Sequence, residues 1–381
     1  MTRQLATSPR QFLADTIFTK GASSPDVELV WQSPEPVEGG VLASDLAFVK
    51  GKWLNLDHWR YWLGTKRPRD DRSIMAPEAL IKVRNAFLGP DNQIVTESGT
   101  AIESRYFGSG RFTRPIKPEE VVAEYRGLHG SAMLNARNYG HWLLQRLPRF
   151  VTLHEQAPGV PILNSVWGDQ GLLARLGIDE SEIRRFPTKE RGEFVFVDEL
   201  LVPTHLSRPG LKRAQDKHRM DRMVRSYTEG IVDDPALPEL LYVARRPDDK
   251  RSGAANKDEL QEYLEGLGFV TWYPIDDPIE RQIQHFRAAR VVVSEIGSQA
   301  LTSMFAGADT TVIILTPEKS KGWGTQRQFQ PQWRQWQRVV CEARGQHYAQ
   351  IIAASDTAYR AFELDMDTVR TALDTYPLRT W

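Results

Sequence analysis

Residues 240–246 read LLYVARR, a short apolar run that ends in two arginines. They begin a regular alternation of strand and helix patterns along the following part of the chain. The expected strands lie at 240–244, 268–272, 291–293 and 311–315, and the expected helices at 257–267, 278–288 and 299–306. Strands that alternate with helices of about ten residues are typical of a parallel sheet with helices on its faces. The stretch therefore predicts an α/β unit with a Rossmann-like sheet.

Polar and charged residues follow two of these expected strands. Arg245 and Arg246 end the first run, and Glu295, Gly297 and Ser298 lie at the exit of the third strand. Open α/β sheets bind ligands at the carboxyl ends of their strands, where a helix N-terminus can hold a phosphate. We therefore expect Arg245, and secondarily Arg246, to bind a diphosphate. Ser298 would donate to phosphate, and Glu295 would accept from ribose hydroxyls or, as a weaker alternative, act as a catalytic base. The simpler alternatives are a solvated loop after the first strand and a capped turn after the third.

A second informative segment, NYGHWLLQRLPRF at residues 138–150, reads as the start of an apolar helix. Asn138 is a natural N-cap, and His141 would then lie in the first turn, at the positive end of the helix dipole. Pro148 should kink or end the helix, because it cannot donate a backbone hydrogen bond. His141 has two functional interpretations, a general base near neutral pH and an anion contact, beside the alternative of a structural histidine.

The rest of the chain divides by pattern into further parts. Short β-type runs alternate with turns over residues 80–107, which indicates an antiparallel section. Helix and strand patterns then alternate, and the segment VDDPALP at 232–238 reads as a linker. We therefore predict an N-terminal extension of uncertain structure at 1–75, an N-terminal lobe at 76–234, and a C-terminal lobe with a tail at 235–381.

Composition limits the classes of partner. The 381 residues carry 49 Lys plus Arg and 49 Asp plus Glu, so the formal net charge is zero. Because nucleic-acid binders usually carry a basic excess, that class is disfavoured. Cys341 is the only cysteine, which excludes an intrachain disulfide and a multi-cysteine metal site. Residues 1–20 lack the apolar core of a signal peptide, and no run of about 18 apolar residues is present. A cytoplasmic protein is expected, with peripheral association at the inner face of a membrane as an option.

The sequence offers no strong metal motif. An Asp-x-Asp motif of the kind that holds Mg²⁺ against a nucleotide does not occur at an expected strand end. Residues 365–367, DMD, have the spacing but lie in the tail at an expected helix start. Arginines and a helix dipole can supply positive charge in place of a cation, so we expect no metal and no cofactor. Metalloprotease, α/β-hydrolase and P-loop motifs are also absent from the sequence.

Taken together, these segments resemble glycosyltransferase family 61, which includes plant xylan-decorating enzymes, the animal EGF-domain O-GlcNAc transferase and bacterial capsule-type proteins. The family pattern has an Asn-x-x-His-Trp helix that ends in Leu-Pro-Arg. It continues with Ser/Ala-Arg-Arg after a strand, an Asn-x-x-Glu helix start, and a Glu/His-Gly-Ser/Ala turn before a helix. The matching residues are Asn138, His141, Trp142, Leu147, Pro148, Arg149, Ala244, Arg245, Arg246, Asn256, Glu259, Glu295, Gly297, Ser298 and Phe305. The resemblance covers roughly residues 80–315.

This resemblance implies a GT-B-like α/β fold: two Rossmann-type lobes facing a cleft, with an N-terminal β-rich extension. It implies an inverting glycosyltransferase that moves a hexose or pentose from a nucleotide-sugar, with UDP as the expected nucleotide. The acceptor would be a glycan or glycolipid of capsular or extracellular polysaccharide biosynthesis. In such an enzyme the N-terminal lobe holds the acceptor and the C-terminal lobe holds the donor.

The resemblance also assigns expected roles. The catalytic residues would be His141 and Glu295, and the substrate-binding residues would be Asn138, Arg149, Arg245, Arg246, Gly297, Ser298 and Ser303. Many relatives carry Asn where this chain has Thr302 or Ser303. That departure motivates an alternative, in which the chain is a non-catalytic relative that serves a glycan pathway as a scaffold or binding protein.

Overall fold

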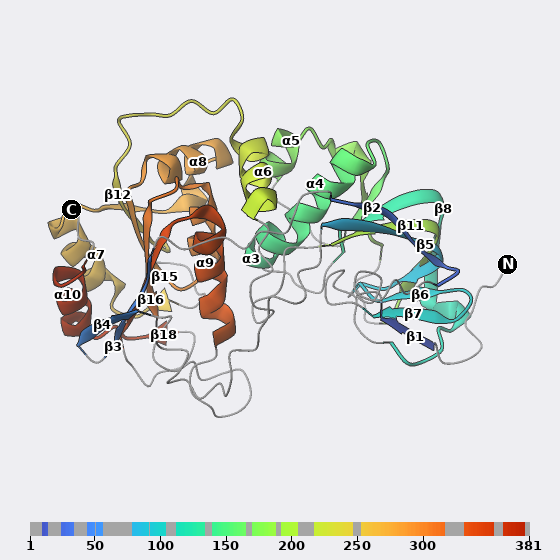
Figure 1. Cartoon of the computed structure of the whole chain (residues 1–381), viewed down its shortest axis with the longest axis horizontal. Helices are drawn as coiled ribbons and strands as arrows, with labels where there is room; N and C mark the ends of the chain where they lie inside the picture. Colours follow the sequence, from blue (N-terminus) through green and yellow to red (C-terminus); the bar gives the residue numbers. More distant parts are fainter. Residues whose placement is uncertain are drawn as a thin grey trace. The chain divides into compact units, whose positions relative to one another are not determined.

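The chain folds into two compact units, each built from helices and strands (Figure 1). The computed structural model describes residues 10–13, 24–33, 44–49, 51–55, 78–90, 92–103, 112–133, 139–164, 170–187, 192–204, 217–246, 253–316, 331–353 and 361–377. The first unit comprises Met1–Glu38 and Arg72–Ala214, and the second comprises Gly39–Asp71 and Gln215–Trp381. The boundaries predicted from the sequence lie after residues 75 and 234. The α/β class is confirmed.

In the described part of the first unit, nine strands form one mixed sheet in the order β1-β7-β6-β5-β11-β8-β9-β10, with β2 paired to β5. The strands are β1 (Arg10–Leu13), β2 (Val27–Gln32), β5 (Ala79–Leu88), β6 (Ile94–Thr96), β7 (Thr100–Glu103), β8 (Val121–Ser131), β9 (Ile162–Asn164), β10 (Ile183–Arg185) and β11 (Phe194–Pro203). Strands β5, β6 and β7 are antiparallel neighbours, which confirms the antiparallel section predicted from the alternating runs and turns. Strands β11, β8, β9 and β10 run parallel.

The apolar helix predicted from residue 138 is present in three consecutive pieces. They are α3 (Tyr139–His141), the π-helix η3 (Trp142–Arg146) and α4 (Leu147–Gln156). Pro148 therefore does not end the helix but lies in the first turn of α4. A proline lacks an N–H and its ring crowds the carbonyl four residues earlier, and a widened π turn just before it accommodates both effects. Asn138, the predicted N-cap, lies outside the described residues.

Shorter helices complete the first unit. They are η2 (Pro118–Glu120), α5 (Gln170–Arg175) and η4 (Glu180–Glu182). Asp179 caps η4, because its carboxylate accepts a 2.7 Å hydrogen bond from the backbone N–H of Ser181. An acidic cap of this kind satisfies a helix-terminal N–H that would otherwise lack a partner.

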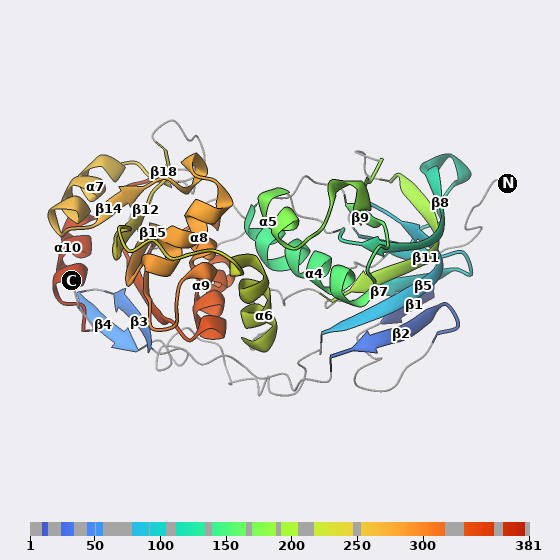
Figure 2. The same cartoon turned by 90° about the horizontal axis from the view of Figure 1, so that it is seen from above.

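The second unit is built on a sheet in the order β14-β12-β15-β16-β17-β3-β4. Figure 2 labels β14, β12, β15, β3 and β4 of this sheet. The strands are β3 (Ser44–Val49), β4 (Lys52–Asn55), β12 (Leu240–Val243), β14 (Val270–Trp272), β15 (Val291–Glu295), β16 (Thr311–Thr316) and β17 (His347–Ile352). All neighbours run parallel except β3 and β4. Two short strands, β13 (Gly253–Ala254) and β18 (Ala361–Phe362), pair separately. The four strands predicted between residues 240 and 315 are thus confirmed.

Helices cover both faces of this sheet (Figure 1). The helices of this unit are α6 (Lys217–Thr228), α7 (Lys257–Gly266), η5 (Pro274–Asp276), α8 (Ile279–Ala288), η6 (Ser298–Phe305), α9 (Pro331–Arg344) and α10 (Met366–Asp374). Leu264 of α7 and Leu373 of α10 pack in one buried cluster with Val293 and Ile313. The next residue along β16, Ile314, belongs to a second cluster with residues of η6 and α9. Because side chains alternate along a strand, the two clusters lie on opposite faces of the sheet.

The strand order places a topological switch point in this unit. From β12 the chain goes outward to β14, and then crosses back to β15 on the other side of β12. Numbered from β12, the first five strands therefore lie in the order 2-1-3-4-5, a doubly wound arrangement whose connections reverse direction between strands 1 and 3. A crevice for ligands is expected outside the carboxyl ends of β12 and β15.

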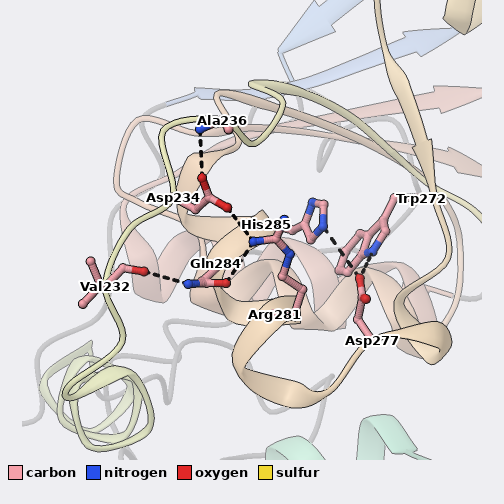
Figure 3. Close-up of polar contacts among 8 residues, drawn as sticks. All are labelled: Val232, Asp234, Ala236, Trp272, Asp277, Arg281, Gln284 and His285. Atoms are coloured by element: carbon pink, nitrogen blue, oxygen red, sulfur yellow. Dashed lines mark hydrogen bonds and ion pairs between the residues drawn. The ribbon is translucent and has the colours of Figure 1, made fainter.

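The segment at 232–238, predicted as a linker, is tied to α8 within the second unit (Figure 3). Gln284 Nε2 donates a 2.8 Å hydrogen bond to the carbonyl of Val232, and Arg281 Nη1 lies 2.6 Å from Oδ2 of Asp234. Proline and acidic residues make the sequence of this segment look loop-like, yet side chains of a later helix satisfy its backbone. Such long-range partners cannot be read from local composition.

Candidate active site

The ends of β12 and β15 bring together residues that are about 50 positions apart in the sequence. The two strands are parallel neighbours, and their register pairs Val243 with Ser294. Arg245 and Glu295 therefore leave the sheet at the same edge, at the switch point. This is the edge at which a doubly wound sheet binds a phosphorylated ligand.

Arg245 lies directly against Gly297. A Cβ atom added at Gly297 would lie 2.2 Å from Nη2 of Arg245 and 2.4 Å from Oε1 of Gln299. The backbone of Gly297 is extended, with φ at 169°, so the glycine is not required for its conformation. Its role is to leave space, because a Cβ at this position would displace the guanidinium from where it lies. The structure thus brings Arg245 and Gly297 together, as the sequence analysis expected for one binding site.

A glutamine amide connects Arg245 to the end of β15. Nη2 of Arg245 donates a 3.1 Å hydrogen bond to Oε1 of Gln299, and Nε2 of Gln299 donates across 3.4 Å to the main-chain oxygen of Glu295. From α9, Nε2 of Gln337 donates a 3.0 Å hydrogen bond to the carbonyl of Gly297. The turn at Gly297 is therefore held by side chains from two helices.

Glu295 is almost completely buried, with 1% of its surface exposed. Its Oε1 accepts a 3.2 Å hydrogen bond from the hydroxyl of Tyr242, and its Oε2 accepts a 2.5 Å hydrogen bond from the backbone N–H of Ala254. Burial raises the pKa of the Glu295 carboxyl, and the Ala254 N–H, Arg245 and Tyr242 oppose that rise. The carboxylate thus joins β15 to β12 and β13. These contacts give Glu295 a structural role between strands, which differs from the capped turn considered for this segment from the sequence.

Arg246 contacts a different residue from the one that Arg245 contacts. It forms an ion pair with Asp276 of η5, and the side chains of the two residues are 47% and 42% exposed. Its carbonyl accepts a 3.3 Å hydrogen bond from Nζ of Lys257. The two consecutive arginines therefore contact different residues, and Arg245 is the one that lies at the switch point.

The residues of η6 differ in accessibility. Ser298, the first residue of η6, is half-buried, whereas Thr302 and Ser303 are 2% and 0% exposed. The Thr302 hydroxyl donates to the carbonyl of Gln299, and the Ser303 carbonyl accepts a 2.9 Å hydrogen bond from Gln346 Nε2. Ser298 is thus the serine of η6 that stands at the helix start next to Gly297, while Ser303 is fully buried.

The other predicted site residues belong to the first unit. His141 is the last residue of α3, and its side chain is outside the described part of the structure, as is the whole of Asn138. Arg149 is fully buried and donates to the carbonyl of Met133, just after β8. One turn earlier, Nη1 of Arg146 donates a 3.3 Å hydrogen bond to Oδ1 of Asn164, at the end of β9. These two guanidinium groups contact the chain at the carboxyl ends of two parallel strands.

Two site features were missed by the sequence analysis. Gln299 is a polar residue in a short and otherwise mostly apolar helix, two positions after Gly297, and this pattern could have indicated it. Gln337 gave no local signal, because it reaches Gly297 from 40 positions away through the fold. Among the residues that the structure describes, no group of three or more His, Cys, Asp or Glu side chains is placed to hold a metal ion.

The comparison with known families agrees with this region. The family model described as Glycosyltransferase 61 matches residues 139–313. The match runs from the helix that carries His141 and Arg149 to strand β16, and it includes Arg245 and Gly297 at the switch point. The matched region thus points to the glycosyltransferase class. The match supports membership in glycosyltransferase family 61.

Two further findings complete the description. No curated protein matches the sequence. Within the described ranges, none of the helices combines the length and the apolar character needed to span a bilayer.

Proposed function

We propose that the protein transfers a sugar from a nucleotide-sugar, with UDP as the nucleotide, to a glycan or glycolipid acceptor in the biosynthesis of a capsular or extracellular polysaccharide. We further propose that the reaction inverts the anomeric carbon, needs no metal, takes place in the cytoplasm, and uses the two units as the lobes of a GT-B-type enzyme. Family membership supports the transferase class. The observation that carries the donor assignment is the Arg245 guanidinium, which lies against Gly297 at the switch point.

The chemistry of the proposal is a direct displacement. An acceptor hydroxyl oxygen bonds to the anomeric carbon as the bond from that carbon to the diphosphate oxygen breaks. The leaving diphosphate gains negative charge, which Arg245 can stabilise with paired hydrogen bonds, and the N–H groups at the start of η6, next to Ser298, can add to this. Because a fixed positive group costs no reorganisation during the reaction, Arg245 can fill the electrostatic role that a metal ion fills elsewhere.

The acceptor proton needs a base, and we propose His141 for this role. An imidazole titrates near pH 6.5 when unperturbed and suits proton removal at neutral pH. His141→Ala should reduce turnover by about 10²–10⁴-fold while nucleotide affinity stays nearly intact. An equal loss of nucleotide affinity would make His141 a phosphate contact instead. A change in melting temperature alone would make it a structural residue.

Calorimetric titration with UDP tests the donor site. Wild-type protein should bind UDP, and Arg245→Ala should weaken binding, because the contact is made in the ground state as well as in the transition state. Arg245→Lys should restore only part of the affinity, since an ammonium lacks the fork geometry. Arg246→Ala is the matched control, because Arg246 pairs with Asp276 instead. Absence of binding at millimolar UDP would refute the donor site.

The competing class is a non-catalytic relative that acts as a scaffold or binding protein. Release of free UDP from UDP-sugars, measured across a donor panel with and without glycan acceptors, separates the two. Slow hydrolysis or transfer supports the enzyme. Binding without turnover across the whole panel supports the scaffold.

A further inference from the structure

The Arg245 side chain is held by a hydrogen bond to the side chain of Gln299. Its Nη2 donates to Oε1 of Gln299 across 3.1 Å, and the same amide donates from Nε2 to the main-chain oxygen of Glu295 across 3.4 Å. The amide of Gln299 is therefore a bridge between the arginine after β12 and the end of β15. One side chain ties together the two strand ends that flank the switch point.

We infer that Gln299 is a positioning residue, which holds the guanidinium of Arg245 over Gly297 in the orientation that binds the diphosphate. The inference rests on the proposed nucleotide site and adds to it the residue that fixes its arginine. Gln299 acts through Arg245 and makes no contact with the ligand in this scheme. Its amide oxygen takes one guanidinium N–H, and its amide nitrogen fixes the amide plane on the backbone of Glu295.

Two physical arguments support this role. An arginine side chain is long and loses rotamer freedom when it binds a ligand, so an arginine that is already held loses less on binding. The space beside Gly297 is also matched to the pair, because a Cβ there would lie 2.2 Å from Nη2 of Arg245 and 2.4 Å from Oε1 of Gln299. The glycine, the arginine and the glutamine thus form one packed group, defined here as the Arg245–Gly297–Gln299 group.

A double-mutant cycle on UDP affinity tests the inference. The four proteins are wild type, Arg245→Ala, Gln299→Leu and the double variant. Gln299→Leu should raise the Kd for UDP by about 10-fold, in the range expected for a charge-assisted hydrogen bond. In the Arg245→Ala background the same change should leave the Kd unchanged, because a residue that acts only through Arg245 has nothing left to position.

A matched glutamine serves as the control. Gln261 of α7 also makes side-chain hydrogen bonds, to Glu265 and to Tyr273, and Gln261→Leu should not alter UDP affinity. If Gln299→Leu lowers the melting temperature more than this control does, Gln299→Met, which keeps the length of the side chain, is carried through the same cycle.

The outcomes separate this inference from the proposed function. If wild type does not bind UDP, or Arg245→Ala does not weaken binding, the donor site itself is wrong. If Arg245→Ala weakens binding but the Gln299 variant has no effect, Gln299 does not position the arginine. If the Gln299 variant weakens binding equally in both backgrounds, it contacts the nucleotide directly, and the inference is overturned.

Discussion

The hydroxyl of Tyr242 on β12 donates a 3.2 Å hydrogen bond to Oε1 of Glu295 at the end of β15, and each residue is only 1% exposed. Tyr242→Phe removes the donor and leaves Oε1 of a buried carboxylate without it. We expect the free energy of unfolding to fall by about 1–3 kcal/mol, the usual cost of an unmade buried hydrogen bond to such a group. Urea unfolding of wild type and variant measures this change in the free energy of unfolding. Tyr273→Phe is the control, because that half-buried hydroxyl bonds Gln261 and its loss should cost about 0.5 kcal/mol or less. Equal losses for the two variants would contradict the prediction.

The raised pKa of Glu295 predicts how stability depends on pH. Burial is the main cause, and it favours the neutral carboxyl in the folded state. The contribution of the Glu295 carboxyl to the free energy of unfolding is therefore fully present below the usual glutamate pKa of about 4.3. It is lost as the pH rises through the pKa that the group has in the folded protein. The unfolding free energy of wild type should thus fall relative to that of Glu295→Gln as pH increases from 4 upward.

Glu295→Gln itself lowers the free energy of unfolding, for a reason that does not depend on pH. The Tyr242 hydroxyl and the Ala254 N–H bond to different oxygens of Glu295, and in glutamine one of these two positions becomes an NH2 donor, so one of the two hydrogen bonds loses its acceptor. The variant should therefore be less stable than wild type at pH 4, by about 1–3 kcal/mol, and the gap should narrow at higher pH. A gap that stays constant across the pH series would contradict the raised pKa.

Gly297→Ala tests the close approach of Arg245 to the backbone. The added Cβ would meet Nη2 of Arg245 at 2.2 Å and Oε1 of Gln299 at 2.4 Å, and both atoms are the far ends of flexible side chains. These side chains can move aside, so the fold should persist while the guanidinium loses its place. We expect UDP affinity to fall as far as in Arg245→Ala, with little change in melting temperature. Gly266→Ala on α7, where a Cβ meets nothing within 4 Å, is the control and should leave affinity unchanged. An unaffected UDP affinity in Gly297→Ala would show that Arg245 is not needed over this glycine.

The sequence was informative where structure follows local pattern. Strands and helices between residues 240 and 315 follow hydrophobic periodicity, and Arg245 and Gly297 were assigned to one site because strand ends of a parallel sheet share an edge. Pattern could not show that β3 and β4 complete the sheet of the second unit, because the pairing of β3 with β17 joins residues about 300 positions apart. Long-range pairing leaves no local signal.

Individual side chains at the site were predicted less well than the elements that carry them. Consecutive Arg245 and Arg246 look equivalent in sequence, yet one contacts Gln299 and the other pairs with Asp276. Successive residues on an extended chain point in different directions, and the positions of η5 and η6 decide which residue each arginine contacts. Glu295 likewise looks like a ligand-binding residue by position, and its structural contacts depend on Tyr242 and Ala254 from other strands.

Arg149 provides a prediction for the first unit. Its guanidinium is fully buried and donates to the carbonyl of Met133. Arg149→Lys loses the planar fork and places an ammonium in the same enclosed space, so the first unit should lose about 1–3 kcal/mol of stability. UDP affinity should stay unchanged if Arg149 serves only to hold the helix against β8. Arg175→Lys, at the end of α5 on a half-buried side chain, is the control and should have a smaller effect. A stable Arg149→Lys protein with weakened substrate binding would return Arg149 to the role of a substrate ligand.

His285 supplies a pH dependence of the opposite sign. Its ring stacks on Trp272, with centroids 4.5 Å apart and planes at 20°, and its Nε2 lies 3.7 Å from Oδ2 of Asp277 (Figure 3). Desolvation lowers the pKa of His285 and Arg281 lowers it further, while Asp277 and Asp234 act against them. Because the pKa of His285 is lowered in the folded protein, its contribution to the free energy of unfolding is present above the usual histidine pKa of about 6.5. That contribution is lost as the pH falls through the pKa of His285 in the folded protein.

His285→Phe keeps an aromatic ring for the stack on Trp272 and removes the titration. The unfolding free energy of wild type should therefore decrease relative to this variant as pH falls from 7 to 5, measured by urea unfolding at each pH. Glu295 contributes to the pH dependence of the wild-type stability with the opposite sign, so only the difference between wild type and variant isolates His285. A control with Trp272→Phe should keep the titration, although it shifts the stability at all pH values. If the difference between wild type and His285→Phe does not change with pH, the pKa of His285 is the same in the folded and unfolded states, and the lowered pKa is wrong.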